Sequence, residues 1–311
     1  MYLKRLLFIL LTTLGVCFLT GKYFDGVYKK NWEVLFFNTI DTLLDNSKQY
    51  NVVMLGNSRF HFGLNPYYID SATGLNSYNF GIGGGGAGSL ELYSLLYLQN
   101  HPAPDYVLIN ADVSLVVREE GLQTQFHLMH YLDNPVIYKY LKPYHSSLAF
   151  ARYLPFSKYC FFDEYNRRSL FRKQIKFEVK EYNVYKGFFN NHEAGKLSFG
   201  MQVISKPVSD SSINMVKNVV DRFTNAGSIV ILVSAPINDN ISEQDKAFVA
   251  KADTIFESIA TEYGCVYFQS EKASQYPDTY FVDELHLNEP GTRVFSRQIG
   301  NYIGGRMKTG K

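Results

Sequence analysis

The stretch that decides the fold is NVVMLGNSR, residues 51–59. A strand is predicted at 51–55 (NVVML), a short continuous apolar run that is typical of a strand buried on both faces of a parallel sheet. Gly56 and Asn57 then indicate a tight turn, and Ser58 follows it directly. Because a serine on a turn at a strand end can present its hydroxyl to a cleft, this stretch predicts both a sheet and a nucleophile.

The chain repeats the pattern of a short strand followed by a helix. Further strands are predicted at 77–80, 105–110, 229–233 and 265–269, and helices at 89–99, 213–225, 243–262 and from near Pro290 onward. This alternation predicts a doubly wound, flavodoxin-like parallel α/β sheet of about five strands. Ligands of such sheets bind at the carboxyl ends of the strands, where Ser58 and a glycine-rich loop at 81–88 are expected.

Residues 118–211 interrupt the alternation. This segment is rich in Tyr, Phe, Arg and Lys, and we expect a large, mostly helical insertion in an α/β domain that covers residues 51–304. Two interpretations stay open: the insertion contacts substrate over the carboxyl face of the sheet, or it packs without touching substrate. The segment also contains a local basic patch, formed by Arg167, Arg168, Arg172 and Lys173. This patch is either an ordinary solvated face or a contact for anionic lipid or glycan.

The N-terminus has the pattern of an export signal. Lys4 and Arg5 precede an apolar run at 6–20, and no small-residue cleavage site follows. We therefore predict an uncleaved signal anchor, a transmembrane helix at 1–22, with a linking helix at 23–50. Because basic residues stay in the cytoplasm, the body is expected in the periplasm or on the outer face of the cell membrane. The alternative is a buried helix of a soluble protein, which would need a polar face.

Composition excludes one class of partner. The chain has 311 residues with 31 basic and 29 acidic side chains, a formal charge of +2, so it lacks the electrostatic footprint of a nucleic-acid-binding protein. Of its three cysteines, Cys17 lies in the apolar run. Whether Cys160 and Cys265 pair is left open by the sequence.

A second motif complements the serine. In VDELHLNEPG, residues 282–291, Asp283 and His286 are three positions apart. That spacing places a carboxylate beside an imidazole, where it can fix the ring tautomer and leave the other nitrogen to accept a proton from Ser58. A serine hydroxyl needs such a base because it is hardly ionised at neutral pH. Either motif alone is common, but together they predict a catalytic triad.

With both motifs in place, the chain resembles the SGNH (GDSL-like) hydrolase superfamily. Gly56-Asn57-Ser58 is similar to that family's first block, with Asn57 in place of the usual Asp, and Asp283-x-x-His286 is similar to its last block. The resemblance spans residues 51–304, although only these short blocks are recognisable.

The resemblance also implies an oxyanion hole. Residues 78–81 (YNFG) are similar to the second block, which implies that the N–H of Gly81, with Asn79 beside it, contributes to the site. The third block, Gly-x-Asn-Asp in the family, reads INAD here, so Asn110 stands as the oxyanion side chain or as an ordinary turn residue. Losing one oxyanion donor typically costs about 10²–10³ in rate, so activity could survive without it.

The resemblance implies a serine esterase or O-acyltransferase, similar to the membrane-anchored polysaccharide O-acetylation proteins of bacterial envelopes. The expected partners are the membrane, an acylated glycan or lipid substrate and envelope biosynthesis proteins, with no nucleic acid and no cofactor. The alternative is an inactive scaffold that binds polysaccharide or a membrane partner. Ser58 Oγ within roughly 2.6–3.2 Å of a His286 nitrogen would favour the enzyme.

Other motifs have ordinary explanations. The loop at 81–86 satisfies the G-x-G-x-x-G pattern of dinucleotide sites, with Asp112 as the candidate ribose acid, but four consecutive glycines match that pattern almost by chance. His127 and His130 are at helical spacing and could ligate a metal, yet a packed pair is the simpler interpretation, and no metal site is predicted.

Two residues close to Ser58 in sequence are further candidates for the site. Arg59 could contact an anionic substrate, whereas capping or packing is the simpler interpretation of His61.

Overall fold

The computed structural model describes residues 2–31, 34–117, 126–144, 148–154, 156–161, 184–189, 207–270 and 276–309. The chain divides into two compact units, one made of Met1–Asn38 and Glu120–Glu181 and the other of Thr39–Glu119 and Tyr182–Lys311. We call the second unit the body. The predicted basic patch at 167–173 lies outside the described residues.

The body contains the predicted sheet. Its strands are β1 (Val52–Leu55), β2 (Ser77–Asn79), β3 (Tyr106–Asn110), β6 (Ile229–Ser234) and β7 (Val266–Gln269). All neighbours are parallel and the order is β2-β1-β3-β6-β7. This is the flavodoxin-like order, in which the chain reverses direction across the sheet between β1 and β3. The predicted fold class is confirmed, and the reversal places the ends of β1 and β3 at the expected ligand-binding position.

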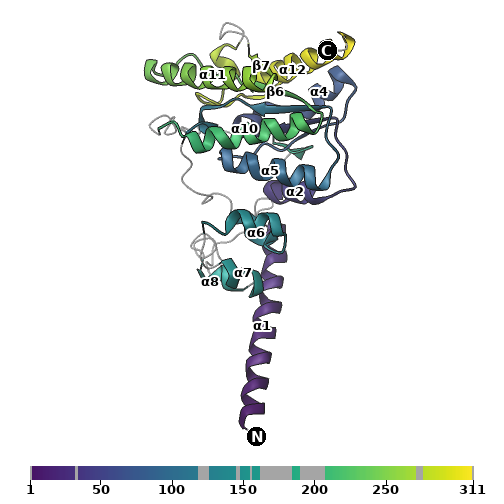
Figure 1. The fold of residues 1–311 in the computed structure, drawn as a ribbon, viewed down its shortest axis with the longest axis vertical. Coiled ribbons are helices and arrows are strands. Elements are labelled where there is room, and N and C mark those ends of the chain that lie inside the picture. The colour runs from purple at the N-terminus through teal and green to yellow at the C-terminus, as the bar shows by residue number, and fades with distance from the viewer. Residues whose placement is uncertain are drawn as a thin grey trace. The chain divides into compact units, whose positions relative to one another are not determined.

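Helices cover both faces of this sheet (Figure 1). In the body they are α3 (Ser58–Gly63), α4 (Pro66–Thr73), α5 (Ala87–Asn100), α10 (Asp210–Asn225), α11 (Glu243–Tyr263) and α12 (Glu289–Thr309), preceded by α2 (Val34–Leu44). Helix α4 packs against α12, and α5 packs against α10. A short 3-10 turn, η1 (Val113–Leu115), follows β3. A second one, η5 (Asp278–Tyr280), precedes the loop that leads into α12.

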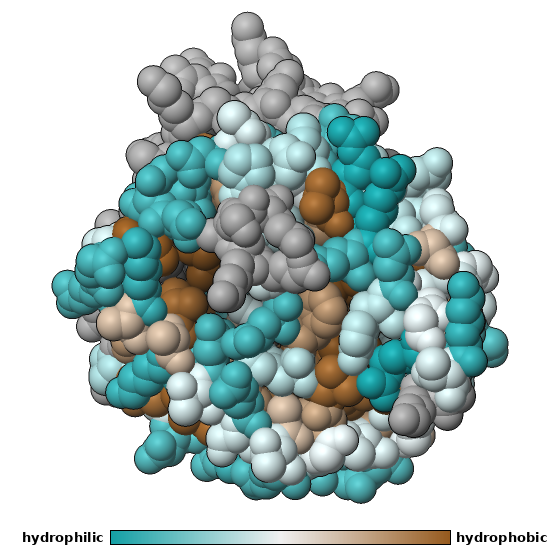
Figure 2. Space-filling model, turned by 90° about the horizontal axis from the view of Figure 1, so that it is seen from above, coloured by the Kyte–Doolittle hydropathy of each residue, from teal (hydrophilic) through white to brown (hydrophobic). Residues whose placement is uncertain are grey.

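The core follows the alternation of side chains along each strand. Val52 and Met54 of β1 face the layer of α4 and α12, together with Phe295 and Ile299 of α12. All four residues of β1 are buried, as expected for a strand covered on both faces. The face seen in Figure 2 is mostly hydrophilic, with hydrophobic residues showing in hollows between polar ones.

A hairpin in the insertion was not predicted from sequence. Strands β4 (Val184–Tyr185) and β5 (Phe188–Phe189) pair antiparallel through Lys186 and Gly187. Both turn residues have positive φ, 46° and 79°, which is the backbone of a two-residue hairpin turn. The Asn79 N–H donates to the Lys186 carbonyl at 2.9 Å, so the hairpin lies against β2. A Cβ on Gly187 would stand 1.9 Å from the Asn79 oxygen, so this approach requires glycine.

The other unit begins with α1 (Tyr2–Asn31). Its segment Tyr2–Gly26 is long and apolar enough to cross a membrane, a property that membrane anchors and signal sequences share. The helix therefore extends beyond the predicted 1–22. The described parts of the insertion in this unit are helical: η2 (Phe126–Tyr131), α6 (Pro135–Leu141), α7 (Leu148–Tyr153) and α8 (Ser157–Phe161).

The histidines of the insertion are packed inside this unit. His127 is fully buried, and the His130 ring lies 3.2 Å from the Asp25 carboxylate, which also accepts hydrogen bonds from Lys158 and Tyr159 at 2.7 and 2.6 Å. Among the described residues, no group of three or more His, Cys, Asp or Glu side chains could hold a metal ion. In the body, Cys265 is a free thiol.

Candidate active site

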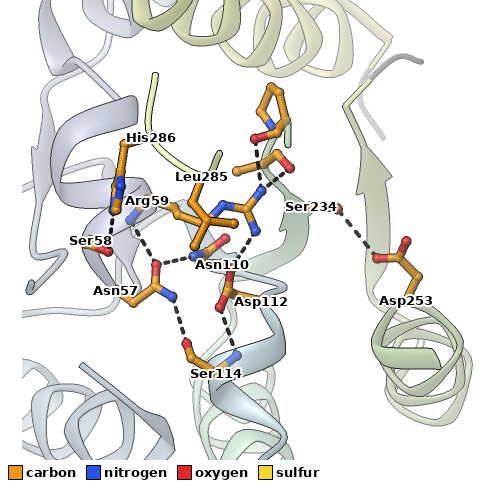
Figure 3. Close-up of polar contacts among 12 residues, drawn as sticks. Asn57, Ser58, Arg59, Asn110, Asp112, Ser114, Ser234, Asp253, Leu285 and His286 are labelled. Atoms are coloured by element: carbon orange, nitrogen blue, oxygen red, sulfur yellow. Dashed lines mark hydrogen bonds and ion pairs between the residues drawn. The ribbon is translucent and has the colours of Figure 1, made fainter. Parts of the chain in front are cut away.

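The turn after β1 positions two side chains in opposite directions. Asn57 is the N-cap of α3, and its Oδ1 accepts the Arg59 N–H at 2.9 Å. This cap makes Ser58 the first residue of the helix, partly exposed at the carboxyl end of β1. Figure 3 shows Ser58 pointing toward His286, while Arg59 points away from it toward Asp112.

The loop before α12 is folded around one carboxylate. Asp283 Oδ1 accepts the backbone N–H groups of Leu285 and His286, each at 2.8 Å. The Val282 N–H donates to the His286 carbonyl at 2.8 Å and closes the loop. An Asp-x-x-His sequence thus fixes its own backbone before any catalytic contact is made.

The structure brings Ser58, His286 and Asp283 together in one hydrogen-bonded row. His286 Nδ1 lies 2.8 Å from Asp283 Oδ2, and His286 Nε2 lies 2.8 Å from Ser58 Oγ. With the Nδ1 proton directed at the carboxylate, Nε2 is the acceptor for the serine hydroxyl proton. The Ser58–His286 distance falls within the range of about 2.6–3.2 Å expected of a nucleophile and its base.

Electrostatics support this assignment of protons. Burial would raise the pKa of Asp283, but the hydrogen bond and charge of His286 hold that pKa below its usual value of 3.8. Two backbone N–H groups act in the same direction. Asp283 is therefore a carboxylate at neutral pH, and it can stabilise an imidazolium when His286 accepts a proton.

The two residues of the second block are used inside the protein. The Gly81 N–H donates to Asn79 Oδ1 at 2.8 Å, and Asn79 Nδ2 donates to the carbonyls of Phe60 and Leu64, each at 2.7 Å. A Cβ on Gly81 would stand 2.6 Å from the backbone nitrogen of His61. Asn79 and Gly81 thus hold α3 against the end of β2, and the Gly81 N–H points at Asn79 rather than at open space.

Asn110 also has an internal partner. Its Nδ2 donates to Asn57 Oδ1 at 2.7 Å, and Asn57 Nδ2 donates to Ser114 Oγ at the same distance. Asn110 is fully buried at the end of β3. It therefore supports the turn that carries Ser58. The Ser58 N–H, at the first helical position, has no intrahelical acceptor.

Arg59 is part of a buried ion pair. Its guanidinium contacts Asp112 Oδ2 at 2.5 Å and donates to the carbonyls of Ala235 and Pro236 beyond β6. The side chains of Arg59 and Asp112 are 4% and 9% exposed, so neither is presented to a substrate. Burial would raise the pKa of Asp112, but the Arg59 charge and its hydrogen bond hold that pKa below 3.8. Sequence reasoning did not connect these residues, which are 53 positions apart.

The same ion pair bears on the dinucleotide alternative. The Asp112 carboxylate, the candidate ribose acceptor, is occupied by Arg59 and by the Ser114 N–H at 2.8 Å. In the glycine-rich loop, the Ile82 N–H donates to the Gly56 carbonyl at 3.0 Å, so the loop packs against the end of β1. This arrangement gives the loop a structural role in supporting the turn that carries Ser58.

Comparisons with known proteins give structural neighbours alone. No family model and no curated protein matches the chain. Similar solved structures include a lipase/acylhydrolase from Enterococcus faecalis, at 12% identity and a TM-score of 0.44, covering 82% of this chain and 95% of that one. The acetyl xylan esterase AlAXEase matches at 14% identity and a TM-score of 0.44, covering 81% of this chain and 98% of its own. The case for an enzyme therefore rests on the side chains of the site.

Proposed function

We propose that this chain is a membrane-anchored serine esterase or O-acyltransferase with Ser58, His286 and Asp283 as its catalytic triad. The observation that carries the proposal is the continuous row of hydrogen bonds, 2.8 Å from Ser58 Oγ to His286 Nε2 and 2.8 Å from His286 Nδ1 to Asp283. Such a row supplies a nucleophile, a base and an orienting carboxylate, which is what acyl transfer requires.

The proposed reaction runs in two halves. Ser58 Oγ attacks the acyl carbonyl carbon while its proton moves to His286 Nε2, and the Ser58 N–H stabilises the oxyanion. The ester C–O bond then breaks, and His286 returns the proton to the leaving alcohol oxygen. Water or a sugar hydroxyl, deprotonated by His286, attacks the acyl-serine and releases the acid or the new ester. Asp283 keeps the imidazole in one tautomer throughout.

The proposed setting is the cell envelope. Within the segment Tyr2–Gly26, the apolar run at 6–20 follows basic residues at positions 4 and 5, which favours an anchor with the body outside the cytoplasm. The proposed substrates are acylated glycans or lipids there, with envelope biosynthesis proteins as partners.

One observation favours the alternative of an inactive, polysaccharide-binding scaffold. The Gly81 N–H and the Asn110 amide, two groups expected in the oxyanion hole, have internal acceptors. An enzyme with the Ser58 N–H as its main donor should be slower, by about 10²–10³ for each missing donor. The scaffold would bind glycan without an activated serine.

Labelling with a fluorophosphonate probe separates the two. The full chain in detergent should label, and Ser58→Ala and His286→Ala should not. Ser234→Ala is the matched control, because Ser234 also ends a parallel strand but has Asp253 at 3.5 Å as its side-chain partner, with no imidazole in that contact. Equal labelling of wild type and Ser58→Ala would refute the triad.

A further inference from the structure

The hairpin β4–β5 places an aromatic side chain against Phe62, the ring that neighbours the proposed catalytic base. The Phe189 ring lies 5.6 Å from the Phe62 ring and 6.1 Å from the His61 ring, measured between centroids. The Phe62 ring in turn lies 5.6 Å from the His286 ring in an edge-on arrangement. Phe62 and Phe189 are both partly exposed. We call these two rings the aromatic pair.

The helix geometry aligns this pair with the nucleophile. Ser58 and Phe62 are four residues apart on α3, so their side chains lie on the same face of the helix, one turn apart. His286 contacts both side chains, through Nε2 to Ser58 and through its ring to Phe62. Phe62 thus lies on the Ser58 face of α3 and beside the imidazole, with Phe189 next to it.

The hairpin is held firmly in this place. Lys186 Nζ contacts Asp70 Oδ2 at 2.6 Å and Asn76 Oδ1 at 2.8 Å, and the Lys186 carbonyl accepts the Asn79 N–H. Gly187 lies directly on the Asn79 oxygen. A segment fixed by an ion pair and a backbone hydrogen bond presents Phe189 at a defined position, which is what a specificity residue needs.

The reaction chemistry identifies which part of a substrate meets this pair. His286 must deliver a proton to the leaving oxygen, so that oxygen has to come within hydrogen-bond reach of Nε2. The alcohol part of the ester therefore lies on the imidazole side of the acyl carbon, and the acyl group lies away from it. The aromatic pair is on the imidazole side.

We propose that Phe62 and Phe189 form the subsite for the alcohol part of the ester, and that this alcohol is a sugar ring. The inference rests on the proposed esterase or acyltransferase function and specifies its substrate. Two adjoining rings offer an apolar surface suited to the CH face of one pyranose, whereas an extended acyl chain would need a longer apolar path. In the transferase direction, the same surface would position the accepting sugar hydroxyl.

The test compares two acetate esters with full-length protein in detergent. Phe189→Ala should lower kcat/KM for an acetylated methyl glucoside about 10-fold relative to ethyl acetate. Tyr185→Ala is the matched control, because Tyr185 is on the same hairpin but contacts Tyr67 and is 43% exposed. That variant should leave the ratio of the two esters unchanged. Phe189→Leu, which keeps apolar volume, should give an intermediate ratio and serves if the alanine variant does not fold.

Three results would overturn the subsite. The two esters could lose activity equally, the loss could follow acyl chain length in a series of ethyl esters, or the ratio could stay at the wild-type value. A second measurement needs no turnover: saturation-transfer NMR of the acetylated glucoside on Ser58→Ala, with and without Phe189→Ala. A signal that needs Phe189, together with no fluorophosphonate labelling of the wild type, would uphold the sugar site and reject the triad. Labelling of the wild type without any such signal would do the reverse.

Discussion

Neighbouring residues of the turn after β1 reach two different ion pairs: Ser58 contacts the Asp283–His286 pair, and Arg59 itself pairs with Asp112. Asp283 pairs with His286 and Asp112 pairs with Arg59, and in both the partner holds the pKa of the carboxyl below 3.8. Arg59 is always charged and contacts two backbone carbonyls as well, so its pair is static. His286 can gain and lose a proton, and its second nitrogen faces Ser58. Similar carboxylates therefore serve different ends because of the partner opposite each.

The largest expected effect is the loss of esterase activity when Ser58 is replaced. Ser58→Ala should lower esterase activity by about 10⁴-fold or more, because no other group replaces the nucleophile. Its thermal midpoint should stay near that of wild type, since within the described part of the chain the Ser58 hydroxyl makes a single hydrogen bond, to His286. Hydrolysis of p-nitrophenyl acetate and differential scanning fluorimetry measure the two quantities. Residual activity above a tenth of wild type would remove Ser58 from the mechanism.

Asp283→Asn tests whether the carboxylate orients the imidazole. The amide oxygen can still accept the Leu285 N–H, but the side chain now favours the wrong tautomer of His286. We expect a loss of about 10⁴-fold in kcat with little change in KM. Asp112→Asn is the comparison, because Asp112 has no contact with His286 in Figure 3. A loss for Asp112→Asn in kcat as large as that of Asp283→Asn, at equal stability, would contradict the division of roles.

The supporting pair should dominate stability. Arg59→Met leaves the Asp112 carboxylate buried without its cation, and we expect a loss of about 3–5 kcal/mol in the free energy of unfolding. Adding Asp112→Asn should restore part of that loss. Urea unfolding of the single and double variants measures the coupling between the two residues. A single variant within about 1 kcal/mol of wild type would show that the pair is not a structural support.

A third buried group sets a pH window. Burial lowers the pKa of His61 from 6.5 to about 4, so below pH 6.5 the unfolded chain binds a proton that the folded chain does not. Stability should therefore fall as the pH drops from 6.5 to about 4. His61→Phe keeps the ring stacked on Phe62 and should flatten the pH dependence of the thermal midpoint in this window. An unchanged slope would exclude His61 as its source.

The smallest expected effect is the loss of stability when Asn57, the cap of the helix that carries Ser58 and Arg59, is replaced. Asn57 caps the helix of Ser58 and accepts the Asn110 amide, so Asn57→Ala should cost about 1–2 kcal/mol of stability. Asn57→Asp keeps the acceptor and should cost less than the alanine variant. Thermal unfolding of both variants gives the comparison, and an equal cost would mean that the cap contributes little.

The strands and the parallel α/β fold class could be predicted, as could the juxtaposition of Ser58 and His286, because short-range patterns encode them. An apolar run of four residues and an Asp-x-x-His loop are visible without a structure. The pairing of Arg59 with Asp112 could not be predicted, because it depends on whether the Arg59 side chain points toward His286 or toward the end of β3. The same holds for Gly81, whose N–H is directed at Asn79. The hairpin at 184–189 did carry a signal, the Lys186-Gly187 dipeptide between apolar pairs, inside a segment whose composition otherwise suggested helices.

The contact between Asn79 and Lys186 has a consequence for solubility. Strand β2 is the last strand of the sheet on its side, and such an edge is a template for pairing with another chain. The Asn79 N–H already donates to the Lys186 carbonyl, and the charged Lys186 side chain lies at the same edge of the sheet, paired with Asp70. The hairpin that carries Phe189 thus also covers part of this edge and opposes pairing of β2 with a strand of another molecule. Substrate recognition and protection from self-association would then depend on the same six residues, 184–189.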